Sequence, residues 1–263
     1  MNFQNKISYY YEYADFKLIL GDSLEMMKKF PSETFDMIFA DPPYFLSSGG
    51  ITCNSGRMVK VDKGEWDKSL SINEKQDFNK RWLSECKRLL KKGGTIWISG
   101  TYHNIYSIGM ALEELEFKIL NNIIWEKSNP SPNLSCRYFT HSTETILWAK
   151  RNKNEKHKFN YKLMKSLNNG KQMKDVWTFS TASKSEKKYG HHPTQKPLKL
   201  LERIIMAATD EGDLILDPFN GSGTTGIAAS RLKRKYLGID IEQSYLDITV
   251  NRLKDSFQMK FEI

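Results

Sequence analysis

Seven short apolar runs, separated by stretches with helical periodicity, constrain the fold of this 263-residue chain more than any other feature. Helical periodicity covers residues 73–92, where Ser71 and Glu74 have capping-box spacing, and a second helix is predicted to start at Pro197. Apolar strands that alternate with helices are typical of a parallel sheet covered on both faces. The sequence therefore predicts an α/β fold, with strands at residues 16–20, 35–40, 94–100, 119–125, 143–150, 213–217 and 235–240.

Two polar regions interrupt this alternation. Residues 45–70 are rich in glycine and polar side chains, and residues 151–191 are basic with scattered aromatics. Lys and Arg total 40 against 31 Asp and Glu, and the net charge of +9 favours a polyanionic partner such as nucleic acid. Two interpretations of residues 151–191 stay open, a solvated insertion or a nucleic-acid contact surface. On the second interpretation, Lys162, Lys165 and Lys171 are expected to contact phosphates.

The segment DPFNGSGTTG, residues 217–226, follows a predicted strand and begins a predicted helix. Gly221, Gly223 and Gly226 match the G-x-G-x-x-G pattern of nucleotide-binding loops. Asp240 ends the next predicted strand, where its carboxylate can bind ribose hydroxyls. Only one strand and one helix follow this loop, too few for a dinucleotide domain unless earlier residues supply the rest. The same loop and acid suffice for S-adenosylmethionine, which the sequence favours as the ligand.

A second loop, DPPY at residues 41–44, also follows a predicted strand. Asp41 stands at the carboxyl end of that strand, where open α/β sheets bind ligands, and Pro42 and Pro43 fix the backbone. The Asp41 carboxylate and the Pro42 carbonyl are thus adjacent acceptors for the two N–H bonds of an exocyclic amine. Tyr44 offers a ring on which the base can stack. Holding both N–H bonds localises the nitrogen lone pair for methyl transfer, and Asp41 stabilises the developing positive charge.

DPPY followed by DPFNGSGTT resembles, in this order, the motifs of the β group of amino-methylating DNA methyltransferases. The resemblance covers nearly the whole chain. It implies a circularly permuted, seven-stranded, Rossmann-like fold for S-adenosylmethionine-dependent methyltransferases, with a target-recognition insertion. Residues 1–150 would form the catalytic half of the core, 151–191 the basic target-recognition insertion, and 192–263 the donor-binding half. In such a fold the strands at 35–40 and 213–217 are neighbours, so both loops face one cleft.

The same resemblance implies individual site residues. HPTQKP at 192–197 is similar to the family's segment for the methionine carboxylate, and GDS at 21–23 to its segment for the donor adenine. The implied catalytic residues are Asp41, Pro42, Pro43 and Tyr44. The implied donor-binding residues are Asp22, Ser23, Thr194, Lys196, Asp217, Phe219, Gly221, Ser222, Gly223, Thr224, Asp240, which matches the ribose-binding acid, and Ile241, which matches the residue that packs on the donor adenine. No metal is expected, because a sulfonium methyl group is already activated.

Adenine N6 is favoured over cytosine N4 as the target, because relatives of the cytosine type usually carry Ser in place of Asp41. Residues 98–150 resemble the second, single-strand-tolerant adenine methyltransferase of the DpnII-type restriction-modification system, a group that modifies GATC. The resemblance therefore implies a restriction-modification enzyme that acts on double- and single-stranded DNA. The alternatives are an RNA adenine-N6 methyltransferase, a dinucleotide-dependent oxidoreductase and a catalytically silent nucleic-acid-binding relative.

Cysteine and histidine spacing bears on metals and on the cell compartment. Cys53, Cys86 and Cys136 form no C-x-x-C pair, and none of the 5 histidines has metal-ligand spacing with them. No apolar run approaches the ~20 residues of a membrane span, and the first residues contain no signal-peptide core. We therefore expect a cytoplasmic protein with reduced thiols, no membrane partner, and histidines on the surface or near phosphates. The oligomeric state is open, with a homodimer among the options.

Overall fold

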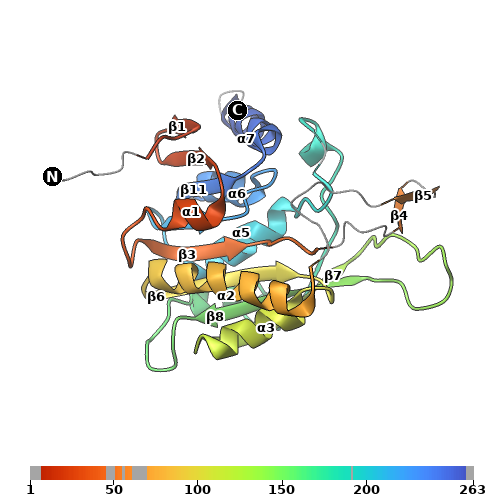
Figure 1. Cartoon of the computed structure of the whole chain (residues 1–263), viewed down its shortest axis with the longest axis horizontal. Coiled ribbons are helices and arrows are strands. Elements are labelled where there is room, and N and C mark those ends of the chain that lie inside the picture. Colours follow the sequence, from red (N-terminus) through yellow and green to blue (C-terminus); the bar gives the residue numbers. More distant parts are fainter. Residues whose placement is uncertain (1–6, 46–50, 55–56, 61–69, 191, 259–263) are drawn as a thin grey trace.

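A central mixed sheet of nine strands lies between two layers of helices in the computed structural model (Figure 1). The structure describes residues 7–45, 51–54, 57–60, 70–190 and 192–258. The strands are β1 (Tyr11–Tyr13), β2 (Phe16–Leu20), β3 (Phe35–Ala40), β4 (Ile51–Asn54), β5 (Arg57–Lys60), β6 (Leu90–Gly100), β7 (Lys118–Lys127), β8 (Thr143–Lys150), β9 (Val176–Phe179), β10 (Leu214–Asp217) and β11 (Lys235–Asp240). The helices are α1 (Ser23–Met27), α2 (Ile72–Leu89), α3 (Ile105–Glu114), α4 (Tyr161–Ser166), the short 3-10 helix η2 (Ser185–Lys187), α5 (Leu198–Ala208), α6 (Thr224–Arg231) and α7 (Gln243–Gln258).

The sheet order is β1-β2-β11-β10-β3-β6-β8-β7-β9, and β4 and β5 pair separately as a hairpin. The run from β2 to β6 is parallel throughout. All seven predicted strands are present, and the predicted pairing of β10 with β3 is confirmed by the register Ile215↔Met37. The expectation of a wholly parallel sheet is wrong, because β8 runs antiparallel to both β6 and β7, and β1 antiparallel to β2.

The side chains of β3 alternate between two apolar cores, one on each face of the sheet. Met37 and Phe39 belong to the core on the face covered by α5, α6 and α7. Ile38 and Ala40 belong to the opposite core, which α1, α2 and α3 cover. Successive side chains of a strand point to opposite faces, so an apolar strand of this kind must be buried on both sides.

Local sequence determines where the two helices flanking the site begin and end. Ser71 and Glu74 form the predicted capping box at the start of α2, which ends at Leu89 rather than at residue 92 because β6 begins at Leu90. Pro197 is the N-cap of α5, one residue before the helix. A proline lacks the backbone N–H that a first turn leaves unpaired, so it is tolerated there.

The strand order creates a crevice between β3 and β10. After β10 the chain passes through α6 to β11 on one side, and after β3 it passes through α2 to β6 on the other. Such a reversal leaves the carboxyl ends of the two neighbouring strands uncovered by either connection, and ligands of open α/β sheets bind there. The loops that follow β3 and β10 contain the two predicted motifs.

Residues 151–190 lie at both edges of the sheet rather than on one surface. β9 joins the sheet beside β7, and Trp177 and Met164 are buried in the core. Residues before β9 lie at the amino edge, the side of the sheet where its parallel strands begin. There the Asn160 amide donates to the carbonyls of Met206 and Thr209 at the end of α5. Residues after β9 lie at the carboxyl edge. The first half of the segment, which includes Lys162, Lys165 and Lys171, therefore lies at the edge opposite the two motif loops, and this position favours the interpretation of that half as a solvated insertion.

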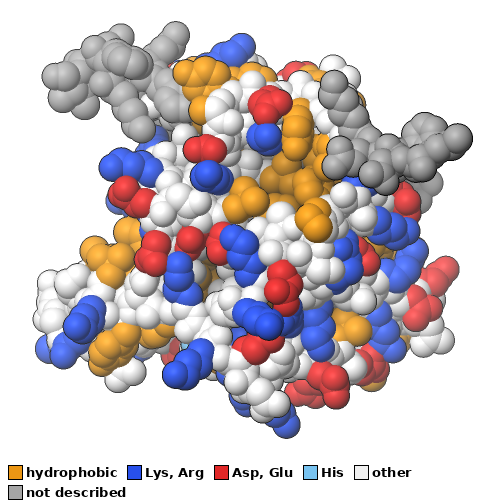
Figure 2. Space-filling model, turned by 90° about the vertical axis from the view of Figure 1, so that its left-hand side faces the viewer, with side chains coloured by type: hydrophobic (Ala, Val, Ile, Leu, Met, Phe, Trp, Pro, Cys, Tyr) orange, Lys and Arg blue, Asp and Glu red, His pale blue; other side chains and the backbone are white. Residues whose placement is uncertain are grey.

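Ion pairs neutralise much of the amino edge. Lys158 pairs with Asp213 at 2.8 Å, Lys91 with Asp36 at 2.8 Å, and Arg151 pairs with both Glu33 and Glu155. Figure 2 shows the side of the molecule that lies at the left in Figure 1, with Lys and Arg interspersed among Asp and Glu over its lower part. A surface of alternating sign has little net attraction for a polyanion beyond about one Debye length, ~10 Å at 0.1 M salt.

Among the described helices, none is long and apolar enough to cross a membrane. Cys86 is buried and Cys136 is exposed, and both are free thiols. Burial raises the pKa of the Cys86 thiol, so it packs as an apolar side chain. The side chain of Cys53 and the remainder of the predicted loop at 45–70 lie outside the described residues, apart from Phe45, Leu70 and the backbone of the β4–β5 hairpin.

Candidate active site

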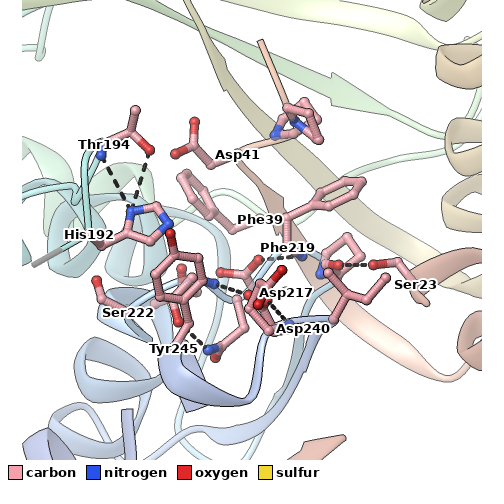
Figure 3. A pocket seen from close by; sticks show the side chains of 18 of the residues that line it. Ser23, Phe39, Asp41, His192, Thr194, Asp217, Phe219, Ser222, Asp240 and Tyr245 are labelled. Carbon is pink, nitrogen blue, oxygen red and sulfur yellow. Dashed lines mark hydrogen bonds between the residues drawn. The ribbon is translucent and has the colours of Figure 1, made fainter. Parts of the chain in front are cut away.

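A cavity of about 300 Å³ opens at the carboxyl ends of β3 and β10. Its size is in the range of small-molecule sites, about 300–1,000 Å³. It is lined by every residue predicted for catalysis or donor binding except Gly223, and additionally by Phe39, Phe78, His192, Asn220 and Tyr245. Figure 3 shows Asp41 beside Thr194 on one side of this cavity and Asp217 and Asp240 on the other. Segments distant in the sequence thus meet at the predicted cleft.

The DPPY loop holds its carboxylate in a network of direct bonds. Asp41 Oδ1 accepts the hydroxyl of Tyr44 at 2.8 Å, and Asp41 Oδ2 accepts the ammonium of Lys196 at 2.6 Å. Burial raises the pKa of Asp41 above its ordinary value, although Lys196 and the Tyr44 hydroxyl oppose that shift. The carboxylate is therefore fixed in orientation and binds a proton more readily than an exposed Asp.

Asp240 lies at the opposite end of the cavity, where backbone N–H groups position it. Its Oδ2 accepts the N–H of Gly221 at 2.6 Å and its Oδ1 accepts the N–H of Glu242 at 2.9 Å. Burial raises the pKa of Asp240 to about 6, with these two N–H groups acting in the other direction. A carboxylate has about four acceptor positions, so two stay available for a diol.

Contacts of Asp217 and Phe219 fix the start of the glycine loop. Asp217 Oδ1 accepts the N–H of Phe219 at 3.1 Å, and burial raises the pKa of Asp217 to about 7. The Phe219 ring packs edge-on against Trp82 of α2, with centroids 5.5 Å apart. Ser23 donates its hydroxyl to the Pro218 carbonyl and so ties the start of α1 to this loop.

The glycines of this loop have different roles. Gly223 is the N-cap of α6 with a left-handed φ of 73°, and a Cβ there would lie 2.3 Å from Thr249 Cγ2. It supports the loop from behind instead of lining the cavity. Gly226 lies against the sheet, where a Cβ would meet Tyr236 at 2.6 Å. Among the three glycines of the pattern, Gly221 is the one that lines the cavity.

Asp22 and Ile241 form the rim on the β2 and β11 side. The Asp22 carboxylate accepts the N–H of Glu25 at 3.0 Å as the N-cap of α1. Ile241 is 57% exposed although it lines the cavity, so its apolar side chain is available to a planar ligand. Both residues line the cavity, and their contact with the donor adenine stays a prediction.

The segment before α5 supplies the third wall. His192 Nδ1 lies 3.4 Å from the N–H of Thr194, and the His192 ring contacts Tyr245 edge-on at 4.5 Å. His192 is half-buried, lines the cavity and lies within the HPTQKP segment next to Thr194. Lys196 is 5% exposed and reaches the DPPY loop.

Glu144, at the start of β8, was missed by sequence reasoning. Its carboxylate pairs with Lys127 at 2.8 Å and lies 3.4 Å from Lys196. Burial pushes the pKa of Glu144 upward, but the two ammonium groups outweigh that effect and hold the pKa below its ordinary value. A charged residue within an apolar, fully paired strand is the feature that could have identified it.

No cluster of three or more His, Cys, Asp or Glu side chains suited to a metal ion occurs among the described residues. The chemistry of the cavity instead suits a nucleoside with a cationic tail. Asp240 retains acceptor positions for a ribose diol, the Ile241 side chain offers apolar area for a base, and Gly221, which has no side chain, lines the same cavity. These residues fit S-adenosylmethionine.

Known proteins share this sequence and fold. The model of the N6/N4 DNA methylase family matches residues 35–251. The type II methyltransferase M2.LlaDCHI of Lactococcus lactis subsp. cremoris is 61% identical over 245 residues, covering 93% of this chain and 91% of that relative. M2.DpnII of Streptococcus pneumoniae, also a type II methyltransferase, is 61% identical over 246 residues, covering 93% and 92%.

A solved structure of a DNA-methyltransferase complex is also similar to this chain in fold and sequence. The complex of M1.HpyAVI with S-adenosylmethionine superposes with a TM-score of 0.66 at 29% identity, covering 90% of this chain and 98% of that one. The oxidoreductase alternative is wrong, since the matched family is one of DNA methylases. Because the family model spans most of the sequence and the motif residues converge on one cavity, the chain belongs to the N6/N4 DNA methylase family and is an S-adenosylmethionine-dependent DNA methyltransferase.

Proposed function

We propose that this methyltransferase modifies adenine N6 within GATC, in DNA, as the modification enzyme of a restriction-modification system in the cytoplasm. The observation that carries the adenine assignment is the Asp41 carboxylate, fixed at the end of β3 and facing the donor loop across one cavity. The GATC site rests on the identity to M2.DpnII together with the resemblance of residues 98–150 to that group.

The residues of the cavity divide between donor and target. Asp240 and Ile241 would hold the ribose and adenine of S-adenosylmethionine, Gly221 would lie against its ribose and methionine portion, and Thr194 would bind its carboxylate. When bound, S-adenosylmethionine supplies a methyl group on sulfur that carries a positive charge, and the sulfur keeps the bonding electrons on transfer. Asp41 accepts an N–H of the target amine and so orients its lone pair.

Proton removal completes the reaction. The nitrogen gains a bond to carbon and must lose one hydrogen as a proton. Asp41 accepts that N–H in the proposed complex, and its raised pKa makes it a better base than an exposed Asp. The Tyr44 hydroxyl, 2.8 Å from Oδ1, keeps the carboxylate in place while the charge on nitrogen rises and falls.

Methylation mapping tests the proposal directly. The enzyme is incubated with S-adenosylmethionine and four oligonucleotides: duplex and single-stranded DNA with one GATC, the same duplex with GTAC, and RNA with GAUC. We expect N6-methyladenine in both GATC substrates, because an unpaired base needs no extrusion from a stack. Equal methylation of the GTAC duplex would refute the site, and product only in RNA would refute the DNA assignment. Sedimentation of the same protein with DNA decides between monomer and homodimer.

The DNA contact surface proposed here is the carboxyl edge of the sheet. The loop joining β7 and β8 projects beyond the right-hand end of the sheet in Figure 1. It carries exposed aromatic side chains. Phe139 is 96% exposed and Tyr138 is 62% exposed. The Tyr138 ring lies 5.3 Å from His141, which stacks on Tyr102 beyond the end of β6. Exposed aromatic rings on a protein of positive net charge can stack with the bases of DNA.

Substitutions on the two edges should therefore differ in effect. Phe139→Ala is expected to weaken binding of GATC duplex about 5- to 100-fold, the value of one base–aromatic stack. Changing Lys162, Lys165 and Lys171 together to Gln is expected to leave the affinity and its salt dependence unchanged, since α4 and the residues after it lie at the amino edge. Fluorescence anisotropy at three salt concentrations measures both. A shallower salt slope for the lysine variant would instead place DNA on that edge.

Donor binding should depend on pH through Asp240. Its pKa of about 6 is raised above that of an unfolded Asp, so the folded carboxyl takes up a proton as pH falls through 6 and loses acceptor capacity for the ribose. We expect calorimetry to show about tenfold weaker S-adenosylmethionine binding at pH 5 than at pH 7.5. Asp240→Asn should bind weakly at both values with a flat profile; an unchanged slope in that variant would assign the proton to another group.

A further inference from the structure

We propose that Glu144 is a positioning residue for Lys196: it receives the Lys196 ammonium when the target amine takes the place of that ammonium at Asp41. The inference rests on the proposed function and concerns how the cavity changes its charge pairing during a turnover. It follows from the bonds of three buried side chains that come from β3, β8 and the segment before α5.

Lys196 has more acceptors around it than it has N–H bonds. Its Nζ lies 2.6 Å from Asp41 Oδ2, 3.0 Å from the Tyr44 hydroxyl and 3.3 Å from the Thr194 carbonyl. These three partners use the three hydrogens of the ammonium. A fourth acceptor, Glu144 Oε2, lies 3.4 Å from the same atom. Lys196 therefore has a second carboxylate within reach to which it can turn without leaving the protein interior.

The two oxygens of Glu144 are used unequally. Oε1 pairs with Lys127 at 2.8 Å, whereas Oε2 is buried and accepts no hydrogen bond from any of the described residues. The side chain is only 12% exposed. Its ion pair with Lys196 at 3.4 Å is longer than a hydrogen bond between an ammonium and a carboxylate, about 2.7–2.9 Å. Oε2 is therefore poised to accept Lys196 at hydrogen-bond distance.

The position of Lys196 also opposes the reaction that Asp41 assists. A full positive charge 2.6 Å from Oδ2 neutralises the carboxylate that must stabilise a positive charge developing on the target nitrogen. Moving the ammonium toward Glu144 removes that competition and frees Oδ2 for the amine. The cluster of Asp41, Glu144, Lys196 and Lys127 stays neutral in charge in both arrangements, so the exchange needs no proton from solvent.

A double-mutant cycle tests this exchange. Single-turnover methylation of the GATC duplex is measured with saturating donor for wild type, Glu144→Gln, Lys196→Met and the double variant. We expect Glu144→Gln to lower the rate about 10²-fold, a typical value for lost transition-state stabilisation. Binding of donor and DNA should stay within threefold. In the Lys196→Met background, the same change should cost less than threefold, because no ammonium is left to be moved.

Controls separate this role from a merely structural one. Glu126 lies on β7, beside β8, and its exposed carboxylate accepts the Thr178 hydroxyl of β9. Glu126→Gln should leave the rate unchanged. Glu144→Asp keeps an acceptor at shorter reach and should restore part of the rate; it also serves if Glu144→Gln fails to fold. Equal losses in both Lys196 backgrounds, or a rate within threefold of wild type for Glu144→Gln, overturn the inference. A wild type that methylates no GATC adenine overturns the proposed function instead.

Discussion

Asp41→Asn is expected to lower the rate of methyl transfer about 10³-fold while S-adenosylmethionine affinity stays within threefold. The amide keeps the shape of the side chain and can still accept the Tyr44 hydroxyl, but it carries no charge to balance the positive charge that develops on the target nitrogen. Donor binding depends on the other end of the cavity, where Asp240 is held by the N–H groups of Gly221 and Glu242. Single-turnover kinetics and calorimetry on the same preparation measure the two quantities.

The other end of the same strand offers a matched control. Asp36 pairs with Lys91 at 2.8 Å at the amino edge of β3, away from the cavity. Asp36→Asn should therefore lower the melting temperature slightly and leave the transfer rate within twofold. A rate above about a tenth of wild type in folded Asp41→Asn protein would contradict the role given to the carboxylate.

Gly223→Ala is expected to destabilise the protein by about 3 kcal/mol and to lower the melting temperature by about 6–12 °C. The methyl group would lie 2.3 Å from Thr249 Cγ2, and the left-handed φ of 73° adds backbone strain. Thr249 is itself held in place, because its hydroxyl accepts the Asn220 amide at 2.9 Å. The side chain therefore cannot turn away without disturbing the donor loop.

Gly170→Ala isolates the contribution of the clash. Gly170 has a similar φ of 76°, but no atom lies within 4 Å of the position of its Cβ. Its substitution should cost only the left-handed strain, about 1 kcal/mol, or about 2–4 °C. Thermal unfolding followed by circular dichroism compares the two variants. Equal shifts in melting temperature would mean that Thr249 yields and that backbone strain alone matters at Gly223.

Local sequence was sufficient for the strands of the core and for both motif loops. Each predicted strand contains a run of apolar side chains, which is the property that burial on both faces requires. β9 was missed because Val176–Phe179 lies within a basic segment, and only Trp177 in it is buried. The antiparallel direction of β8 cannot be predicted from its own residues. It depends on the length of the loop at 128–142 and on the edge of β6 that is left open for pairing.

Motif residues were easier to predict than the residues that support them. The loops at 41–44 and 217–224 follow strands that are neighbours in the sheet, so their convergence follows from topology. Glu144 reaches the site through tertiary contacts that no spacing rule describes. Gly223 fits the motif but acts behind the loop, because a glycine pattern does not distinguish contact with a ligand from contact with a helix.

The pairing of β3 with β10 also governs when the protein can fold during its synthesis. The N–H of Leu214 donates to the Asp36 carboxylate across a separation of 178 residues, and β11 inserts between β10 and β2. Contacts of such separation make folding slow, since a long loop must close before they form. Until residues 214–240 have left the ribosome, β2 and β3 each keep an unpaired edge that can bind another strand. The emerging chain therefore has its period of greatest exposure to aggregation late in translation, when nearly all of it has already been made.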